Sequence, residues 1–158
     1  MRVGITGHRG LPDDVAVLVR SALDAELARY DAGTLVGVSC IADGPDAWFA
    51  RAVLERGGRI EVVVPADAYR DGLPEWHRGE YDALLSAAVR VHPTGLAVSD
   101  AEAHMAGSQV LVGLVDRLLA VWDGQPARGY GGTADVVEHA RRTGVPVDVL
   151  WPEGASRE

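Results

Sequence analysis

The sequence has a single cysteine and no lysine, and each shortage excludes a class of protein. One thiol, Cys40, cannot form a disulfide within the chain, so a small disulfide-stapled fold is excluded. The 15 basic residues are all arginines and are outnumbered by 23 Asp and Glu, which gives a formal net charge of -8. Binding to a nucleic-acid backbone usually depends on clustered Lys and Arg, so this balance argues against nucleic acid as a partner. A mononucleotide remains compatible, because backbone amides and one arginine can hold one phosphate.

Long apolar runs and targeting signals are also missing. No run approaches the roughly 20 residues of a membrane-spanning helix, which argues against a membrane partner. The first residues, MRVGIT, enter a strand without the regions of a secretion signal, so we expect a cytoplasmic protein. The 158 residues fit one domain, which we place at residues 1–152 with a short polar tail at 153–158. The histidines show no metal-ligand spacing, so we expect no metal and no cofactor.

Short apolar segments alternate with segments of helical periodicity along the whole chain. We expect strands at about 2–6, 35–40, 60–64, 89–92, 118–122 and 147–151. Helices are expected to begin near Pro12, Pro45, Glu75, Ser99 or Asp100, and Thr133. This alternation predicts an α/β protein with a three-layer, doubly wound (Rossmann-like), mostly parallel sheet of about six strands and helices on both faces. Ligands of such sheets bind outside the carboxyl ends of the strands, where the strand order reverses.

Residues 117–142 combine an apolar strand, a glycine-rich loop and a helix start. The first N–H groups of a helix have no intrahelical partner, and the helix dipole adds partial positive charge there. We therefore predict that Gly131, Gly132 and Thr133 bind a phosphate through backbone N–H groups. The alternative is that Thr133 only caps the helix and the glycines only turn the chain. Arg128 in the same loop is either a phosphate clamp or a solvated arginine.

The loop after the first strand carries Gly7, His8 and Arg9. The guanidinium of Arg9 suits a phosphate, because its N–H donors form a fork that matches phosphate oxygens. The alternative is that Arg9 pairs with Asp13 or Asp14, which follow in the chain. His8 is a candidate for ligand binding, against the simpler interpretation of a polar surface residue.

Polar side chains also follow the second and fifth strands. Ser39, Asp43 and Asp46 have hydroxyl and carboxylate oxygens that suit a ribose or a base. Alternatively, Asp43 or Asp46 only satisfies the first-turn amides of the next helix. Asp123 stands directly at the carboxyl end of the fifth strand, where a carboxylate faces the crevice, and we predict that it binds a ribose hydroxyl.

Three blocks of the chain carry a family resemblance. The block VSCIADGPDAWFARAVLERGGRIEVVVP is similar to DprA (Smf) proteins, in which a Ser-Gly-Leu-Ala-x-Gly-x-Asp turn opens a helix that ends at Gly-Gly. ITGHRG resembles the Val-Gly-Ser-Arg turn of the same proteins, and GYGGTADVVEHARRTGVPVDVLWP resembles the Pro-Gly-Gly-x-Gly-Thr helix start of LOG proteins. The matching residues are Gly7, Arg9, Ser39, Ala42, Gly44, Asp46, Gly57, Gly58, Gly132 and Thr133. Together the blocks resemble the SLOG superfamily of Rossmann-like domains.

The resemblance implies that the chain binds or senses a nucleotide or a nucleotide-derived ligand. In this first hypothesis the phosphate lies at the GGT helix start, Gly7 and Arg9 flank it, and Ser39, Asp46 and Asp123 contact the sugar or base. Because related domains commonly pair through their helices, the hypothesis leaves a homo-oligomer open.

A second hypothesis is a LOG-like phosphoribohydrolase, which cleaves the N-glycosidic bond of a nucleoside monophosphate. LOG proteins have a glutamate three residues after the matching threonine, and here that position is Val136. Whether the chain is an enzyme is therefore left open, with Asp135, Asp123 and His104 as substitutes for the missing catalytic pair. A third hypothesis, DNA handling as implied by DprA, is opposed by the acidic charge.

Overall fold

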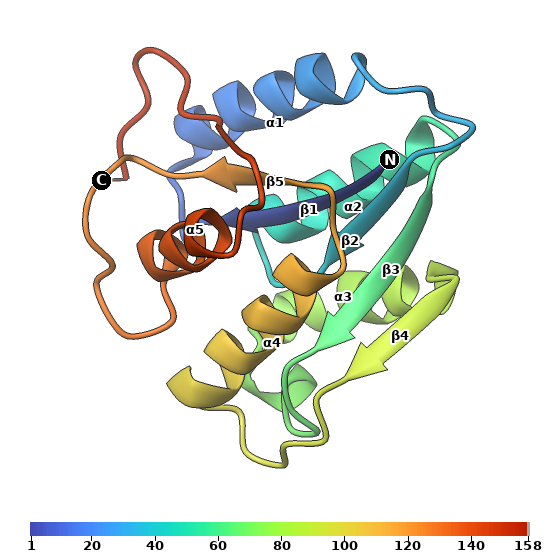
Figure 1. The fold of residues 1–158 in the computed structure, drawn as a ribbon, viewed down its shortest axis with the longest axis vertical. Coiled ribbons are helices and arrows are strands. Elements are labelled where there is room, and N and C mark those ends of the chain that lie inside the picture. The colour runs from blue at the N-terminus through green and yellow to red at the C-terminus, as the bar shows by residue number, and fades with distance from the viewer. Residues whose placement is uncertain (158) are drawn as a thin grey trace.

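The computed structural model describes residues 1–157, which form a six-stranded parallel sheet between two layers of helices (Figure 1). The strands are β1 (Arg2–Gly7), β2 (Val36–Ser39), β3 (Arg59–Val64), β4 (Arg90–Pro93), β5 (Arg117–Val121) and β6 (Val147–Val149). The helices are α1 (Asp13–Leu27), α2 (Pro45–Glu55), α3 (Glu75–Ala87), α4 (Ala101–Gly113), α5 (Thr133–Arg142) and the short 3-10 helix η1 (Arg70–Gly72). The predicted α/β fold is confirmed. None of the helices described is long and apolar enough to cross a membrane.

The strand order β4-β3-β2-β1-β5-β6 places the two halves of the chain on opposite sides of β1. The chain moves outward from β1 to β4, and α4 then carries it back to β5, which pairs with β1 from Val3↔Arg117 to Gly7↔Val121. Helices α1, α2 and α3 cover one face of the sheet, and α4 and α5 cover the other (Figure 1). The strand order thus reverses between β1 and β5, and a ligand site is expected outside the carboxyl ends of these two strands.

The core lies on both faces of the central strands. Its largest fully buried side chains are Phe49, Ile5, Leu23, Leu27, Leu35, Ile41, Ile60, Leu84, Leu111, Leu118, Leu119 and Val3. Helix α2 packs closely on β2 because Gly37 has no side chain, since a Cβ there would lie 3.0 Å from Phe49 Cε1. Cys40 is buried in this core, as expected of a small apolar side chain.

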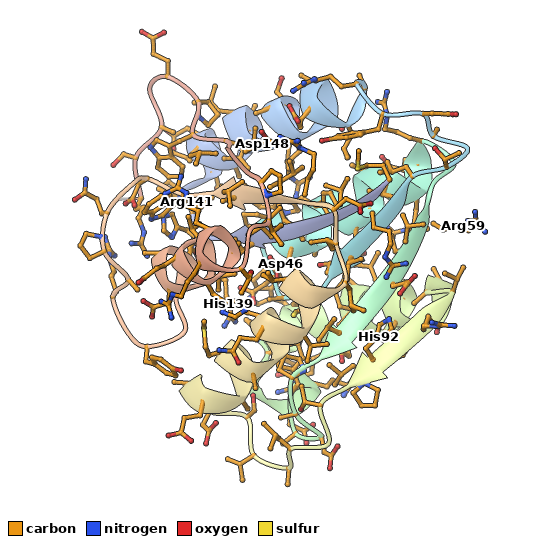
Figure 2. The ribbon with its side chains drawn as sticks, in the orientation of Figure 1. Asp46, Arg59, His92, His139, Arg141 and Asp148 are labelled. Atoms are coloured by element: carbon orange, nitrogen blue, oxygen red, sulfur yellow. The ribbon has the colours of Figure 1, made fainter. Side chains whose placement is uncertain are left out.

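One charged cluster, formed by Arg2, Glu61 and His92, joins three strands of the sheet. Arg2 donates from Nη1 and Nη2 to the two carboxylate oxygens of Glu61 at 2.7 and 2.9 Å. His92 Nε2 donates to Glu61 Oε1 at 2.6 Å, from the edge strand where Figure 2 labels it. Glu61, the polar residue inside the apolar β3 sequence, is therefore buried with its charge fully paired.

The segment after β6 turns back toward the sheet. The segment lies on the side to which the β1 and β5 arrows point (Figure 1). Trp151 meets the ring of His8 edge to face, with centroids 5.7 Å apart, and Ala155 packs against the core. The turn between them contains Gly154 at φ +86 and a bond from the Ala155 N–H to the Pro152 carbonyl. Of the polar tail expected at 153–158, Ala155 and Arg157 therefore lie against the domain, whereas Glu153, Gly154 and Ser156 are exposed.

Candidate functional site

A cleft of about 300 Å³ lies where the strand order reverses, outside the carboxyl ends of β1 and β5. The loops after β1 and β5, the start of α5 and one side of α4 form its walls. Its lining includes these residues that the sequence predicted to bind ligand: Gly7, His8, Arg9, Asp46, Gly131, Gly132 and Thr133. Ser39 and Asp123, predicted with them, do not line the cleft. The structure thus brings together residues from all three blocks of the sequence that carry the family resemblance.

The close approach of β1, β5 and α2 at this edge depends on Gly7. A Cβ on Gly7 would lie 2.9 Å from the Cβ of Pro45 and 3.0 Å from the Cβ of Val121. Contacts this short do not occur between real side chains, so the first turn of α2 reaches the cleft only because position 7 is glycine. The glycine therefore shapes the site through packing.

The glycines of the β5–α5 loop are held by groups of the protein itself. The Gly131 N–H donates to Asp135 Oδ2 at 2.9 Å, and the Gly132 N–H donates to the Gly129 carbonyl at 3.2 Å. A Cβ on Gly132 would lie 2.9 Å from the Cβ of Ala127, which excludes a side chain there. The prediction that these two N–H groups are open to a phosphate is therefore wrong. Both residues line the cleft, but their N–H groups fix the loop.

The next two backbone amides are open. Within residues 1–157, the N–H groups of Thr133 and Ala134 have no hydrogen-bond partner, and they begin a helix of 10 residues. Thr133 is only 7% exposed and lines the cleft, and no described residue bonds to its hydroxyl. The positive end of the α5 helix dipole lies at these donors and strengthens their attraction for an anion. Two amides and a hydroxyl at a helix start are an arrangement that binds an anion.

His8 and Asp123 join the loops after β1 and β5. Nε2 of the buried His8 ring accepts the Asp123 N–H at 3.0 Å and lies 3.1 Å from Asp123 Oδ1. Burial lowers the pKa of His8, and the positive charge of Arg157 lowers it further, so the neutral ring is the main form at pH 7. Asp123 Oδ1 also accepts the Gln125 N–H at 3.0 Å. Asp123, predicted to bind a ribose, thus bonds to His8 and its own loop instead.

Arg9 pairs with a carboxylate from the second loop. Its Nε donates to Asp43 Oδ1 at 2.9 Å, which differs from the pairing with Asp13 or Asp14 that the sequence left open. The Arg9 side chain is about half exposed and lies on the rim of the cleft. Its charge is therefore partly balanced before any ligand arrives.

Ser39 stabilises the turn between β2 and α2. Its hydroxyl donates to the Asp46 carbonyl at 2.9 Å and accepts the Ile41 N–H at 2.9 Å, and the residue is fully buried. The prediction that Ser39 contacts a ligand is not supported by this geometry. Ile41 has φ 48, a left-handed conformation that a β-branched residue rarely adopts, and its carbonyl accepts a bond from His77 Nε2 at 2.9 Å. Such strain is common where a fold fixes functional groups.

The turn fixed by Ser39 presents Asp46 to the cleft. Asp46 lies in the first turn of α2, and Figure 2 shows it near the middle of the molecule. Burial raises the pKa of Asp46 to about 7, although Arg9 and the Ala42 backbone amide act in the opposite direction. At neutral pH the carboxyl is therefore present in both forms, so it can donate or accept a hydrogen bond to a ligand.

The sequence analysis missed four polar residues of the cleft and named a fifth only as a candidate for catalysis. The missed residues are Thr6, Tyr69, Ser108 and Arg157, and the catalytic candidate is His104. His104 Nε2 is 2.9 Å from Ser99 Oγ, and burial lowers the pKa of His104. His104 and Ser108 are four residues apart on an otherwise apolar helix, and this spacing was the signal that they share one face.

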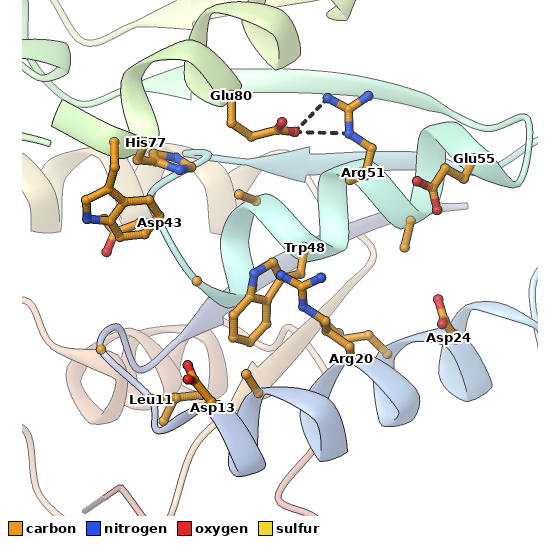
Figure 3. A pocket seen from close by; sticks show the side chains of 17 residues that line it. Leu11, Asp13, Arg20, Asp24, Asp43, Trp48, Arg51, Glu55, His77 and Glu80 are labelled. Atoms are coloured by element: carbon orange, nitrogen blue, oxygen red, sulfur yellow. Dashed lines mark hydrogen bonds and ion pairs between the residues drawn. The ribbon is translucent and has the colours of Figure 1, made fainter. Parts of the chain in front are cut away.

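A larger hollow, of about 740 Å³, lies between α1, α2 and α3 (Figure 3). Arg20 stacks over the Trp48 ring at 4.7 Å, and Arg51 donates to Glu80 at 2.6 Å. None of the predicted ligand-binding residues lines this groove. Among the described residues, no group of three or more His, Cys, Asp or Glu is placed to hold a metal ion.

No protein-family model and no curated protein matches the chain, but solved structures do. DprA from Streptococcus pneumoniae superposes with a TM-score of 0.68 at 18% identity, over 97% of this chain and 51% of that protein. DprA from Helicobacter pylori, described by its single-stranded DNA binding mode, gives 0.69 at 16%, over 99% and 68%. The chain shares the fold of part of each DprA protein. It spans about half the length of the pneumococcal protein.

The same fold occurs in the molybdenum cofactor carrier protein of Chlamydomonas reinhardtii. The TM-score is 0.54 at 18% identity, over 94% of this chain and 75% of that protein. These structures confirm the predicted Rossmann-like fold. They do not support the argument against nucleic acid, since the H. pylori protein binds single-stranded DNA.

Proposed function

We propose that this chain is a nucleotide-binding domain, which holds the phosphate of a nucleotide or nucleotide-derived ligand at the start of α5. The observation that supports the proposal is the pair of open N–H groups at Thr133 and Ala134, beside the Thr133 hydroxyl, to which no described residue bonds. Thr133 lines a cleft at the reversal of strand order, which is where ligands of doubly wound sheets bind, and Ala134 follows it in the first turn of α5. A cleft of about 300 Å³ is in the size range of small-molecule sites and suits one mononucleotide.

The remaining lining residues suit the sugar and base of such a ligand. Asp46 offers a carboxyl that exchanges a proton near neutral pH, and Tyr69 and His104 offer ring surfaces packed edge to face, 5.7 Å apart. Aromatic rings bind the faces of bases well, and a carboxyl group bonds to a ribose hydroxyl or to a base nitrogen. With the phosphate at Thr133, the rest of the ligand extends across the cleft toward α2 and α4.

The test compares AMP, GMP, CMP and UMP with the corresponding nucleosides by calorimetry and thermal shift. We expect a monophosphate to bind, and a ligand at about 100 times its dissociation constant to add about 2.7 kcal/mol to stability. Thr133→Val keeps the shape but removes the hydroxyl, and should weaken monophosphate binding by about 10-fold.

Thr143→Val is the matched control, because Thr143 lies at the other end of α5 and bonds to the His139 carbonyl. Failure of every monophosphate to bind would contradict the proposal. Binding of a single-stranded oligonucleotide alone, weakening steeply with salt, would favour DNA handling instead.

A second candidate, a phosphoribohydrolase, is favoured by the state of Asp46. Of the substitutes that the sequence offered, the Asp135 carboxylate accepts the Gly131 N–H and the Asp123 carboxylate accepts the Gln125 N–H. Asp46 lies in the cleft with a pKa of about 7, which suits a group that protonates a departing base. Release of free base from a nucleoside monophosphate, lost in Asp46→Asn and kept in Asp24→Asn on α1, would support this activity. Binding without base release would leave the domain as a sensor.

A further inference from the structure

We infer that Arg157, in the segment after β6, is a phosphate-binding residue of the cleft, which makes this segment part of the ligand site. The inference rests on the proposed function and names the group that balances the charge of the ligand. The N–H groups of Thr133 and Ala134 are neutral donors, so a phosphate held by them alone keeps its full negative charge. An arginine side chain in the same cleft supplies the opposite charge.

The structure directs Arg157 into the cleft by several contacts. Trp151 is fixed against His8, Gly154 reverses the chain at φ +86, and Ala155 packs against the core. Arg157 then lines the cleft with a side chain that is 17% exposed. An arginine on a mobile polar tail would stay in water, so burial to this degree requires a defined position.

The charge of Arg157 is only weakly balanced in the protein. Its Nε lies 3.8 Å from Asp123 Oδ2, which is beyond hydrogen-bonding distance, and it has no hydrogen bond within residues 1–157. Asp123 is shared, because it also faces His8 and accepts the Gln125 N–H. The guanidinium is therefore partly removed from water without a close partner. A phosphate at the start of α5 would supply that partner.

The test measures monophosphate and nucleoside affinities for three variants by calorimetry. Arg157→Gln should weaken the tightest-binding nucleoside monophosphate by about 10-fold or more, and change the affinity for its nucleoside by less than about twofold. Arg142→Gln is the matched control, because Arg142 on α5 is exposed and paired with Glu138 at 2.9 Å. Gly154→Val, which strains the turn, should reproduce the selective loss without removing a charge.

Four outcomes are distinguishable. Selective loss of monophosphate affinity in Arg157→Gln and Gly154→Val, with Arg142→Gln unchanged, supports the inference. Equal monophosphate affinity in the wild type and Arg157→Gln overturns the inference and leaves the proposed function standing. Equal loss for the monophosphate and the nucleoside shows that Arg157 only maintains the fold, and also overturns it. No binding of any monophosphate by the wild type overturns both proposals.

Discussion

Glu61 is buried and Asp46 is half-buried in the same fold, yet the pKa values of these two carboxyl groups move in opposite directions. The guanidinium of Arg2 lowers the pKa of Glu61 to about 2, with help from His92 and against the effect of burial. Burial raises the pKa of Asp46 to about 7, because no side chain donates a hydrogen bond to it within the described residues. Burial is thus common to both, and the presence of a close partner decides the sign.

The difference separates a structural charge from a candidate functional one. Glu61 ties β3 to β1 and β4 inside the sheet, far from the ligand cleft, and all its charge is used there. Asp46 is held by a strained turn at the edge of the cleft, and because only the Ala42 backbone amide acts on it as a donor, the rest of its hydrogen-bonding capacity is left for a ligand. A carboxyl that costs stability without a partner is better evidence for a binding site than one that is fully paired.

The largest expected effect follows from breaking the paired carboxylate. Glu61→Gln leaves the Arg2 guanidinium without its counter-charge and should lower the free energy of unfolding by about 3 kcal/mol at pH 7, measured in urea. The folded pKa of Glu61 is lowered, so its contribution is present above the unfolded value and is lost as the pH falls toward 2. The curves of the two proteins should therefore converge in acid.

Two results bear on this first prediction. Nucleotide affinity of Glu61→Gln at pH 7 should equal that of the wild type within twofold, because the cluster is outside the cleft. A loss of less than about 1 kcal/mol would mean that the cluster contributes no more than an exposed ion pair, and the contrast with Asp46 would fail.

The second expected effect is an increase in the free energy of unfolding. Asp46→Asn removes a carboxylate that the folded state ionises only with difficulty, and should stabilise the protein by about 2 kcal/mol at pH 8. The folded pKa is raised above the unfolded value, so the contribution of Asp46 to stability is present at low pH and is lost as the pH rises through about 7. Unfolding at pH 5 and pH 8 checks this, and equal stability of both proteins at pH 8 would contradict it.

The third effect concerns binding. Ionised Asp46 repels a phosphate-bearing ligand and no longer donates a proton, so monophosphate affinity of the wild type relative to Asp46→Asn should fall by about fivefold from pH 6 to pH 8. The ratio is used because the phosphate itself titrates near pH 6. A constant ratio across this range would show that Asp46 does not face the ligand.

The sequence alone was sufficient to predict those features that depend on residues close together in the chain. Short, mostly apolar segments indicated the six strands, and the switch in period placed the start of α5 at Thr133, where it is observed. The capture of the Gly131 N–H by Asp135 also had a local signal, since an acid at the third helical position often bonds backward to an N–H. The bond from Ser39 to the Ile41 N–H is a similar local pattern.

Other features depend on distant contacts and gave no sequence signal. Arg157 reaches the cleft because Trp151 packs on His8, a contact between opposite ends of the chain. Arg9 pairs with Asp43 across two loops, not with its sequence neighbours. The pKa of Asp46 depends on how much water the assembled cleft admits. Sequence patterns located the loops of the site, but which groups in them are already bonded is decided by tertiary structure.

The smallest effect on stability and ligand binding is expected from a substitution in the larger hollow. Arg51 and Glu80 form an ion pair across the α1–α2–α3 groove, and both side chains are more than 40% exposed (Figure 3). Water screens such a pair, so Arg51→Ala should change the free energy of unfolding by less than about 0.5 kcal/mol and leave nucleotide affinity unchanged. A fivefold loss of nucleotide affinity in Arg51→Ala, with normal binding by Thr133→Val, would move the ligand from the cleft to this groove. Volume alone does not decide which of the two hollows binds the ligand. The groove is larger, but its arginines already have partners within the protein. The cleft is smaller, but the N–H groups at the start of α5 have no partner within the described residues.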